Sequence, residues 1–527
     1  MRRLKHWGWG YEDEQPSPEE LRGLAAMAAQ RLGYGSTEPE TAVALSDVHL
    51  PAPRLSAPEA LSAILRDDPY ERALHAYGRS YSDIVRAFRG RYDHVPDLVA
   101  HPRTEMEIQA VLGWALDCGA AVIPYGGGTS VVGGVEPAVD AERFTGVVTV
   151  DCRGLDRVLE VDPISLSARI QAGATGPGLE EQLHAHGLTL RHFPQSFQFS
   201  TLGGWIATRA GGHFATLYTH IDDLVESVRA LTPSGVWESR RLPGSGAGVS
   251  PDRMMLGSEG TLGIITEAWV RVRVRPRFRS SAGVRFPSFA AGAEAVRSLS
   301  QSGLNPAGCR LIDPEEAALT GAGDGSHALL VLGFESPAYD TEPELALALE
   351  SCGDHGGSWE PRRQSKDGGA VSSWREAFLR APYLRDMFVA MGVLSETFES
   401  AVTWERFPAF HQTVVAATTA AVHAVCGSGT VTCRFTHVYP DGPAPYFTVL
   451  APARRGQELE QWAEIKRAAA DAVLAGGGTI THHHAVGRDH RPWYDRQRPD
   501  PFAVALRGAK RAVDPAGALN PGVLLDP

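Results

Sequence analysis

The feature that most constrains the fold is a run of three glycines placed directly after a predicted βαβ unit. Residues 97–100 and 121–124 are mostly apolar and predict two strands, and Thr104 with Glu107 forms a capping-box pattern for the helix between them. The second strand runs into the segment Pro124, Tyr125, Gly126, Gly127, Gly128, Thr129 and Ser130. Glycine tolerates positive φ and brings backbone N–H groups close to a ligand, so this loop suits a phosphate group. Taken alone, a tight turn without a ligand is the alternative.

Two further segments combine glycines with small and hydroxyl residues. The second comprises Pro194, Gln195, Ser196, Phe197, Gln198, Phe199 and Ser200, followed after two glycines by Ala207, Thr208, Arg209 and Ala210. The third comprises Glu259, Gly260, Thr261, Leu262, Gly263, Ile264 and Ile265. Alone, the second reads as a loop entering a helix and the third as a hairpin. On one α/β scaffold, the three segments together indicate a single cofactor site.

The pattern along the chain predicts an α+β protein with two main domains. A helix over 17–33 opens an N-terminal helical arm of residues 1–92, and a two-part α/β cofactor domain follows over 93–276. Residues 277–504 form a cap that begins with a ferredoxin-like βαββαβ order. The expected cap elements are strands 282–286, 308–312, 328–334 and 357–360, helices 289–302 and 342–352, a mostly helical stretch 370–426, a hairpin 430–451 and a helix 457–475. Residues 505–527 return to the cofactor domain, and no internal repeat is evident.

Composition excludes several classes of protein. The net charge of −12 argues against nucleic-acid binding, and no apolar run is long enough to span a membrane. No lysine follows a G-x-x-x-x-G pattern, so a Walker A loop is excluded. Scattered cysteines without a signal peptide lead us to expect a cytoplasmic protein, and the scarcity of lysine indicates a GC-rich bacterial genome. A homodimer and contact with a membrane surface stay open.

The three glycine-rich segments together resemble the FAD-binding domain of the vanillyl-alcohol-oxidase/p-cresol-methylhydroxylase flavoproteins. The resemblance implies FAD between two α/β subdomains, with the first segment as the pyrophosphate loop and the third lining the flavin. Some members attach FAD through a histidine near the first loop. No histidine occurs between 121 and 135, so we expect non-covalent FAD.

Further motifs resemble the alkyldihydroxyacetonephosphate (alkylglycerone-phosphate) synthase family. They are Trp7-Gly8-Trp9-Gly10-Tyr11, Tyr218 with Ile221-Asp222-Asp223-Leu224-Val225, Cys309-Arg310-Leu311-Ile312-Asp313, Trp404-Glu405-Arg406, Cys433-Arg434 with Thr436, and Thr481-His482-His483-His484 with Val486-Gly487. The resemblance implies exchange of the acyl chain of acyl-dihydroxyacetone phosphate for a fatty alcohol, through a flavin N5 adduct and without net redox change. Such a reaction belongs to ether lipid biosynthesis.

The same resemblance assigns site residues. Tyr446 matches the proton-transferring tyrosine, Arg310 and Arg406 match two substrate-contacting arginines, and the catalytic triple-histidine motif matches His482, His483 and His484. In a strand, His482 and His484 would share one face. We expect no metal, because no cysteine or carboxylate near the run completes a ligand set. Without the resemblance, each of these residues would more often be structural.

Two other functions stay open. An FAD-linked oxidase or dehydrogenase of a D-2-hydroxy acid or specialised metabolite would use Arg310 for a carboxylate, a histidine as base and N5 as hydride acceptor. The segment Leu519-Asn520-Pro521-Gly522 is similar to D-lactate-dehydrogenase-like flavoproteins and favours that alternative. A non-catalytic flavin-binding scaffold would be marked by loss of Tyr446 or the histidine run, and both are present.

Overall fold

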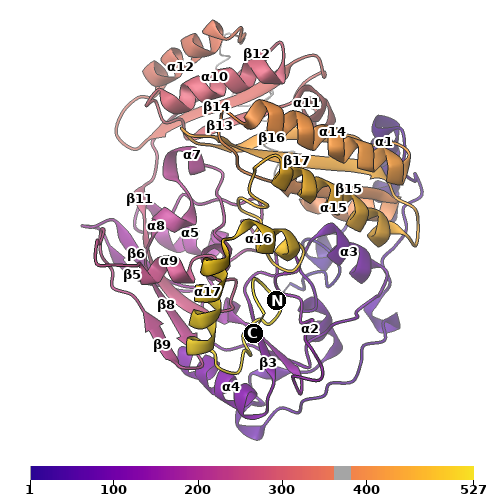
Figure 1. Ribbon diagram of the computed structural model, residues 1–527, viewed down its shortest axis with the longest axis vertical. Coiled ribbons are helices and arrows are strands. Elements are labelled where there is room, and N and C mark those ends of the chain that lie inside the picture. Colours follow the sequence, from indigo (N-terminus) through magenta and orange to yellow (C-terminus); the bar gives the residue numbers. More distant parts are fainter. Residues whose placement is uncertain (1, 361–381, 527) are drawn as a thin grey trace.

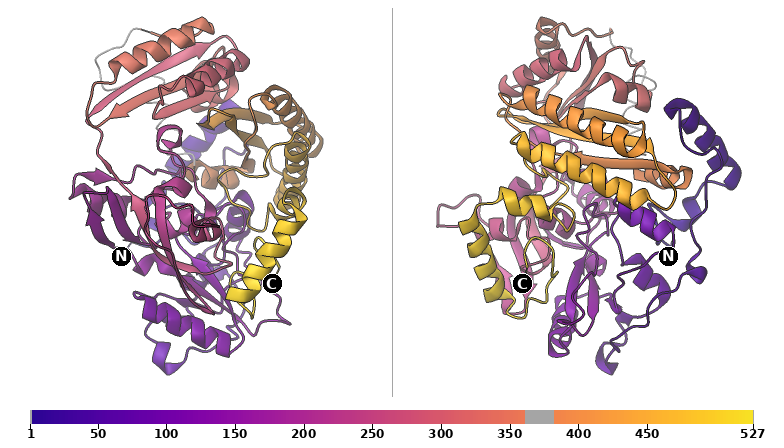
Figure 2. Two further views of the ribbon diagram at one scale, coloured as in Figure 1. Left: turned by 60° about the vertical axis from the view of Figure 1, so that its left-hand side comes forward. Right: turned by 45° about the vertical axis from the view of Figure 1, so that its right-hand side comes forward.

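A computed structural model describes residues 2–360 and 382–526. Its lower half in Figure 1 holds the sheets of the cofactor domain, and its upper half holds the cap sheet with its helices. The N-terminal arm, indigo in the right view of Figure 2, runs from the lower half to the cap. The expected helix 17–33 is confirmed as α1 (Pro18–Leu32), with Ser17 and Glu20 forming a capping box and Gly33 in the left-handed conformation.

The first sheet of the cofactor domain has the order β1-β2-β4-β3. Its strands are β1 (Leu65–Arg66), β2 (Leu98–Ala100), β3 (Ala121–Tyr125) and β4 (Val147–Asp151). The predicted βαβ unit is β2, helix α4 (Glu105–Asp117) and β3, and β4 lies between its two parallel strands. The edge strand β1 comes from the region expected to be only a helical arm, and it pairs antiparallel with β2. The C-terminal tail bridges to this sheet where Leu519 pairs with Val122.

The second sheet is antiparallel and has the order β5-β6-β10-β8-β9. Its strands are β5 (Val158–Asp162), β6 (Ser167–Gln171), β8 (Val225–Thr232), β9 (Gly235–Glu238) and β10 (Ile264–Arg271). The chain from 264 to 274 is divided between two sheets: β10 joins this sheet, whereas β11 (Arg273–Val274) pairs with β7 (Leu188–Thr189) in a separate ribbon. The glycine loop after β3 and the segment leading into β10 therefore belong to the two different sheets.

The cap sheet has six antiparallel strands in the order β12-β14-β13-β16-β17-β15. They are β12 (Phe278–Phe286), β13 (Gly308–Ile312), β14 (Ala328–Ser336), β15 (Val393–Glu399), β16 (Thr430–Val438) and β17 (Pro443–Pro452). The expected strand 357–360 is wrong, because only Ser358 bridges to Arg285 at the edge of β12. The stretch expected to be mostly helical contains β15, and its residues 370–381 lie outside the described residues.

The cap contains an internal repeat that the sequence analysis did not detect. β12, α10 (Phe289–Gln301), β13, β14 and α12 (Glu342–Asp354) form one βαββα unit. β15, α14 (Phe407–Cys426), β16, β17 and α15 (Glu458–Ala475) form a second. Because β13 pairs with β16, the two units meet at their second strands and the strand order reads as a mirror image across that pair.

The two faces of the cap sheet carry different residues because side chains alternate along a strand. Cys309, Leu311, Cys433, Phe435 and Phe447 lie in one hydrophobic core with residues of α10, α12, α14 and α15. The intervening positions face the cofactor domain, and they include Arg310, Arg434, Thr436, Tyr446 and Thr448. The repeat thus supplies a helix-covered sheet whose open face is the ceiling of a cavity.

The remaining helices are mostly short. They are α2 (Pro69–Leu74), α3 (Tyr81–Phe88), α5 (Gly176–His184), α6 (Leu202–Thr208), α7 (Ala215–Tyr218), α8 (Ile221–Leu224), α9 (Pro251–Met255), α11 (Pro314–Thr320), α16 (Arg491–Gln497) and α17 (Asp500–Val513). In the described part of the chain, no helix combines the length and apolar character needed to cross a bilayer.

Candidate active site

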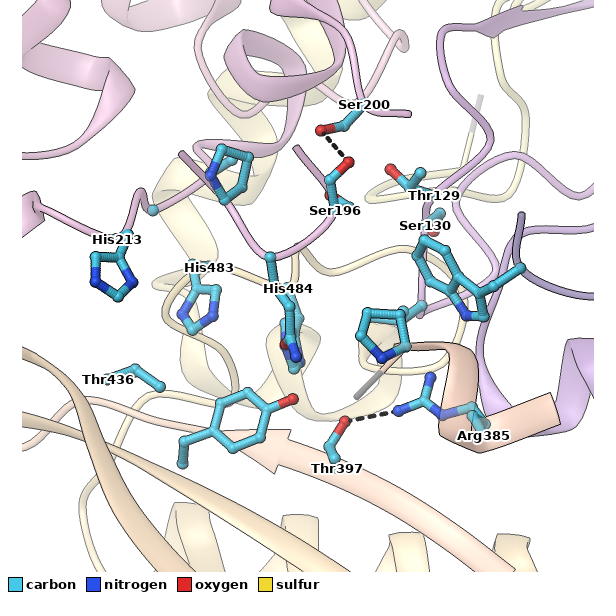
Figure 3. Close-up of a pocket in the computed structure, with 18 of the residues that line it drawn as sticks. Thr129, Ser130, Ser196, Ser200, His213, Arg385, Thr397, Thr436, His483 and His484 are labelled. Carbon is cyan, nitrogen blue, oxygen red and sulfur yellow. Dashed lines mark hydrogen bonds between the residues drawn. The ribbon is translucent and has the colours of Figure 1, made fainter. Parts of the chain in front are cut away.

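A cavity of about 340 Å³ lies between the glycine loop and the open face of the cap sheet. Gly126–Ser130 line one side, and Arg310, Arg434 and Tyr446 line the other. Figure 3 shows His483 and His484 side by side among the lining residues, with Ser196 above them and the cap residues Thr436 and Thr397 below. Leu319, Leu384, Phe388 and Leu450 add an apolar region to the same cavity. The cavity therefore joins cationic, imidazole-bearing and apolar surfaces.

A narrower channel of about 100 Å³ continues from this cavity into the cofactor domain. Both spaces share Gly126, Ser130, Thr201, Gly204 and Thr208 as lining residues. Most walls of the channel lack long side chains, and a Cβ added to Gly127 would collide with the carbonyl oxygen of Phe199. A wall of backbone and hydroxyl groups lets a pyrophosphate approach closely, so these residues fit FAD.

The structure places most predicted cofactor residues along this path. The large cavity is lined by Gly126, Gly127, Gly128, Thr129, Ser130, Pro194, Gln195, Ser196, Ser200, Thr208 and Ala210. The channel is lined by Pro124, Tyr125, Ala207, Glu259, Gly260, Gly263, Ile264 and Ile265. Neither space is lined by Phe197, Gln198 or Phe199. Arg209 pairs with Asp222, and both line a third cavity together with Thr261 and Leu262.

The triple-histidine segment is a bend rather than a strand, so the expected alternation is wrong. The buried carboxylate of Glu399 accepts hydrogen bonds of 2.8–3.0 Å from the backbone N–H groups of His482, His483 and His484. Because three successive amides converge on one acceptor, His483 and His484 line the cavity while His482 faces away. Burial alone would raise the pKa of Glu399, but His483 holds it well below its usual range.

A second carboxylate fixes the other end of this segment. Glu259 accepts from the backbone N–H groups of Val486 and Gly487 at 2.8 Å. Its own backbone carbonyl accepts from the side chain of Asn520 at 2.7 Å, which ties the C-terminal tail to the flavin channel. Burial raises the pKa of Glu259 to about 7. The histidines are therefore positioned from both domains.

Tyr446 has the cationic and imidazole neighbours that a proton-transferring tyrosine needs. Its ring lies 4.0 Å from the guanidinium of Arg434, which also pairs with Glu316. The ring centroids of His484 and His483 lie 5.3 and 6.2 Å away. Burial lowers the pKa of His484 well below its usual range, so that imidazole is a neutral acceptor.

The two predicted substrate arginines occupy different environments. Arg310 is buried in β13 and lines the cavity, where its Nη2 donates to the backbone carbonyl of His213 at 3.3 Å. Burial and the neighbouring Arg434 lower the pKa of Arg310 to about 9. Arg406 lies exposed at the start of α14 and does not line the cavity, so the structure does not bring it together with Arg310, and its substrate contact stays a prediction. Among the described residues, Arg434 and Arg385 also line the cavity.

A histidine cluster adjoins the cavity. Ring nitrogens of His437, His482 and His483 lie within 4.8 Å of one another, and the Glu399 carboxylate lies 3.3 Å from His483, so the argument that no cysteine or carboxylate is near the run does not hold. Both nitrogens of His437 contact Thr436 or Gly212, and both nitrogens of His482 contact His483 or Tyr439. These contacts describe a hydrogen-bonded network, and a site without metal stays a prediction.

Two family models match this chain. The model described as FAD binding domain matches residues 96–239, and the model described as FAD linked oxidases, C-terminal domain, matches residues 275–524. Alkyldihydroxyacetonephosphate synthase of Dictyostelium discoideum is 31% identical over 487 residues, covering 88% of this chain and 78% of the relative. This chain belongs to the alkyldihydroxyacetonephosphate synthase family.

Other relatives agree with this family assignment. The synthase of Trypanosoma brucei brucei is also 31% identical, over 88% of this chain and 78% of the relative. Glycolate oxidase subunit GlcD of Bacillus subtilis is more distant, at 25% identity over 82% of this chain and 89% of that protein. The relatives at 31% identity are eukaryotic, so they do not support the expected bacterial source.

Solved structures confirm the predicted fold class. An alkyldihydroxyacetonephosphate synthase structure superimposes with a TM-score of 0.82 at 27% identity, covering 98% of both chains. p-Cresol methylhydroxylase has the same fold, with a TM-score of 0.68 at 14% identity over 88% of this chain and 94% of that one. The chain is an FAD-dependent enzyme of the alkyldihydroxyacetonephosphate synthase family, whereas non-covalent attachment stays a prediction.

Sequence reasoning did not assign four of the residues that shape the synthase-like site. Arg434 repeats the Cys-Arg pair of Cys309-Arg310 at the equivalent strand of the cap repeat, and that repetition was the available signal. Glu399 and Tyr439 reach the histidines from β15 and from the turn after β16. Trp9 of the N-terminal motif also lines the cavity, with its indole nitrogen buried and without a hydrogen-bond partner among residues 2–360 and 382–526.

Proposed function

We propose that this chain exchanges the acyl chain of acyl-dihydroxyacetone phosphate for a fatty alcohol, which would form the alkyldihydroxyacetonephosphate that its relatives are named for. One observation carries the proposal: a single cavity joins the FAD loop, the buried arginines 310 and 434, and Tyr446 with its two imidazoles. All six cysteines carry free thiols, which supports the proposed cytoplasmic location.

The cavity offers a place for each part of that substrate. The guanidinium groups of Arg310 and Arg434 suit a phosphate, because a planar fork of N–H donors matches its oxygens. Leu319, Phe388 and Leu450 offer an apolar wall for an acyl or alkyl chain. Bound FAD, held by the glycine loop and the segment before β10, supplies an electron-accepting ring system.

The protein's own groups then handle protons. The ester C–O bond breaks and the fatty carboxylate leaves with the electron pair, while the alcohol loses its O–H proton and forms the ether C–O bond. Tyr446 and the neutral imidazole of His484 are placed to accept and return protons during this exchange. No electrons are gained or lost overall, so the reaction needs no electron acceptor.

The deciding experiment incubates the purified flavoprotein anaerobically with acyl-dihydroxyacetone phosphate and a fatty alcohol, without an electron acceptor. We expect alkyl-dihydroxyacetone phosphate only when both substrates are present. Tyr446→Phe should retain FAD and lose at least ~10²-fold in turnover, the usual contribution of a positioned proton-transfer group. Flavin bleaching by a D-2-hydroxy acid, with no alkyl product from the substrate pair, would instead establish the oxidoreductase alternative.

A further inference from the structure

A continuous line of hydrogen bonds leaves the reaction cavity through the histidine cluster. His483 lines the cavity, and its Nδ1 lies 3.0 Å from Nδ1 of His482. Nε2 of His482 lies 2.8 Å from the hydroxyl of Tyr439. The same hydroxyl contacts Nε2 of His220. Four polar side chains therefore connect in series without a gap.

This line ends in a different cavity, here called the outer cavity. It has a volume of about 840 Å³, and His482, Tyr439 and His220 all line it. The opposite walls include Tyr494 of α16 and Phe502 of α17. His483 does not line the outer cavity, and neither Tyr439 nor His220 lines the reaction cavity. Although His482 lines the outer cavity, its two ring nitrogens contact His483 and Tyr439, so the line of hydrogen bonds continues through Tyr439 to His220.

Each member of the line is able to pass a proton. A neutral imidazole has one donor and one acceptor nitrogen, and a tyrosine hydroxyl both donates and accepts. The directions of all the hydrogen bonds can therefore reverse together when one proton enters and another leaves. Burial lowers the pKa of His220 to about 4 and that of His482 well below its usual range, so both rings are neutral at pH 7.

Charged groups around the line lie mainly at its two ends. Glu399 contacts the backbone of the histidine segment and lies 3.3 Å from Nδ1 of His483. At the outer end, Asp222, Asp223, Arg209 and Arg253 line the outer cavity. The wall that a proton leaving His220 would meet therefore includes two carboxylates, each paired with an arginine, beside apolar side chains.

We propose that His483, His482, Tyr439 and His220 form a proton path from the reaction cavity to the outer cavity. The inference rests on the proposed function, because acyl-for-alkyl exchange at neutral pH produces a fatty carboxylate and one proton per turnover. That proton comes from the alcohol O–H, and the base that accepts it must be reset before the next cycle. Tyr439 and His220 do not line the reaction cavity, so they act through His482 and His483.

The test uses the full-length holoenzyme and a matched pair of tyrosine variants. Tyr439→Phe removes the hydroxyl that links His482 to His220 and keeps the ring. Tyr494→Phe makes the same change elsewhere on the wall of the outer cavity and is the control. Flavin content, KM for both substrates and turnover are measured, and turnover is then repeated with increasing imidazole as a diffusible proton carrier.

We expect Tyr439→Phe to lose about 10- to 100-fold in turnover with unchanged flavin content and KM. Imidazole should restore much of that loss in a concentration-dependent manner, which a merely structural defect would not allow. Tyr494→Phe and wild type should be insensitive to imidazole. Equal turnover of the two tyrosine variants, or a loss in Tyr439→Phe that imidazole leaves unchanged, would overturn the path.

A spectroscopic measurement separates this proposal from the proposed function. In the resting holoenzyme, low-field proton NMR should show strongly hydrogen-bonded imidazole N–H signals that Tyr439→Phe removes and Tyr494→Phe retains. If wild type forms no alkyl product, the proposed function fails, and the proton path for that reaction is overturned with it. If product forms but the low-field signals are the same in both variants, the path alone is overturned.

Discussion

At the scale of single residues, the cavity brings two guanidinium groups together under one sheet. Both groups are held by protein contacts: Arg434 pairs with Glu316, and Arg310 donates to the backbone carbonyl of His213. Burial and the nearby Arg434 lower the pKa of Arg310 to about 9, because both make the charged form of the guanidinium less favourable. An anionic substrate group would offset both effects, so Arg310 is suited to bind phosphate.

Arg310→Lys should weaken substrate binding while leaving FAD in place, because lysine keeps the charge but loses the planar fork. We expect KM for the phosphate substrate to rise about 10-fold or more, corresponding to one charge-assisted hydrogen bond of ~1.5–3 kcal/mol. Arg406→Lys is the matched control, since Arg406 is exposed outside the cavity. A larger KM effect from Arg406→Lys than from Arg310→Lys would contradict these assignments.

Gly127 shows why the flavin loop tolerates no side chain. A Cβ at this position would collide with the carbonyl oxygen and carbonyl carbon of Phe199. Gly127→Val should therefore abolish FAD binding, measured as flavin absorbance per folded chain. Gly113→Val, on the exposed side of α4 with no atom within 4 Å of the added Cβ, should retain FAD. Full flavin content in a folded Gly127→Val protein would refute this role of the loop.

At the scale of elements, sequence motifs predicted a helix or strand correctly where contacts between residues near in sequence determine its ends. The capping box and terminal glycine of α1 were readable because both act within one turn. The bend at His482–His484 was not readable, because its cause is Glu399 on β15, more than 80 residues away. The strand predicted at 357–360 is reduced to one bridge, between Ser358 and Arg285. Strand β15 was not predicted, because its extended conformation depends on pairing with β17, which is distant in sequence.

The residues of the candidate site divide in the same way, into those found from contiguous motifs and those brought in by strand pairing. Residues in contiguous motifs, such as the glycine loop, Tyr446 and Arg310, were found from the sequence and all line the two connected spaces. Arg434, Glu399 and Tyr439 join the site only through strand pairing and the cap repeat. Arg406 shows the converse, because its motif matched while its position at the start of α14 turns it to the surface.

Glu399→Gln tests whether one carboxylate shapes the histidine segment. A glutamine has one acceptor oxygen and would place its NH₂ group against converging backbone donors. We expect a loss of ~2–4 kcal/mol in unfolding free energy, from charge-assisted hydrogen bonds replaced by an unsatisfied donor. Turnover should fall strongly while FAD content is unchanged. Wild-type turnover and stability in this variant would show that the segment is held by other contacts.

At the scale of the whole molecule, contacts distant in sequence join the arm, the cofactor domain and the cap. The buried Lys5–Asp386 pair, at 3.2 Å, connects the N-terminus to the segment before β15. Arg89 of the arm pairs with Glu458 of α15 at 2.7 Å. Asn520 donates to the backbone carbonyls of Gly134, after β3, and Glu259, before β10, so the C-terminal tail contacts loops of both cofactor-domain sheets. The cavity between the domains therefore depends on both ends of the chain.

One such contact makes stability depend on pH. His101 lies 3.1 Å from Glu71 of α2 and 3.5 Å from Asp151 of β4, between the arm and the first sheet. Burial would lower the pKa of His101, but the two carboxylates raise it to about 9. An unfolded histidine has a pKa of about 6.5, so the folded state binds the extra proton between these values. This stabilisation is complete below about pH 6.5 and is lost as pH rises through about 9.

His101→Gln should remove this pH dependence, because glutamine keeps hydrogen-bonding capacity without a titrating charge. Since 35% of the His101 side chain is exposed, solvent screening limits the expected effect to the order of 1 kcal/mol. The difference in thermal midpoint between wild type and variant should be largest at pH 6 and shrink by pH 9.5. Both proteins are compared in the same buffers, so other titrating groups cancel. A difference that grows with rising pH would mean that His101 is neutral in the folded protein and that its carboxylate neighbours do not hold the arm through charge.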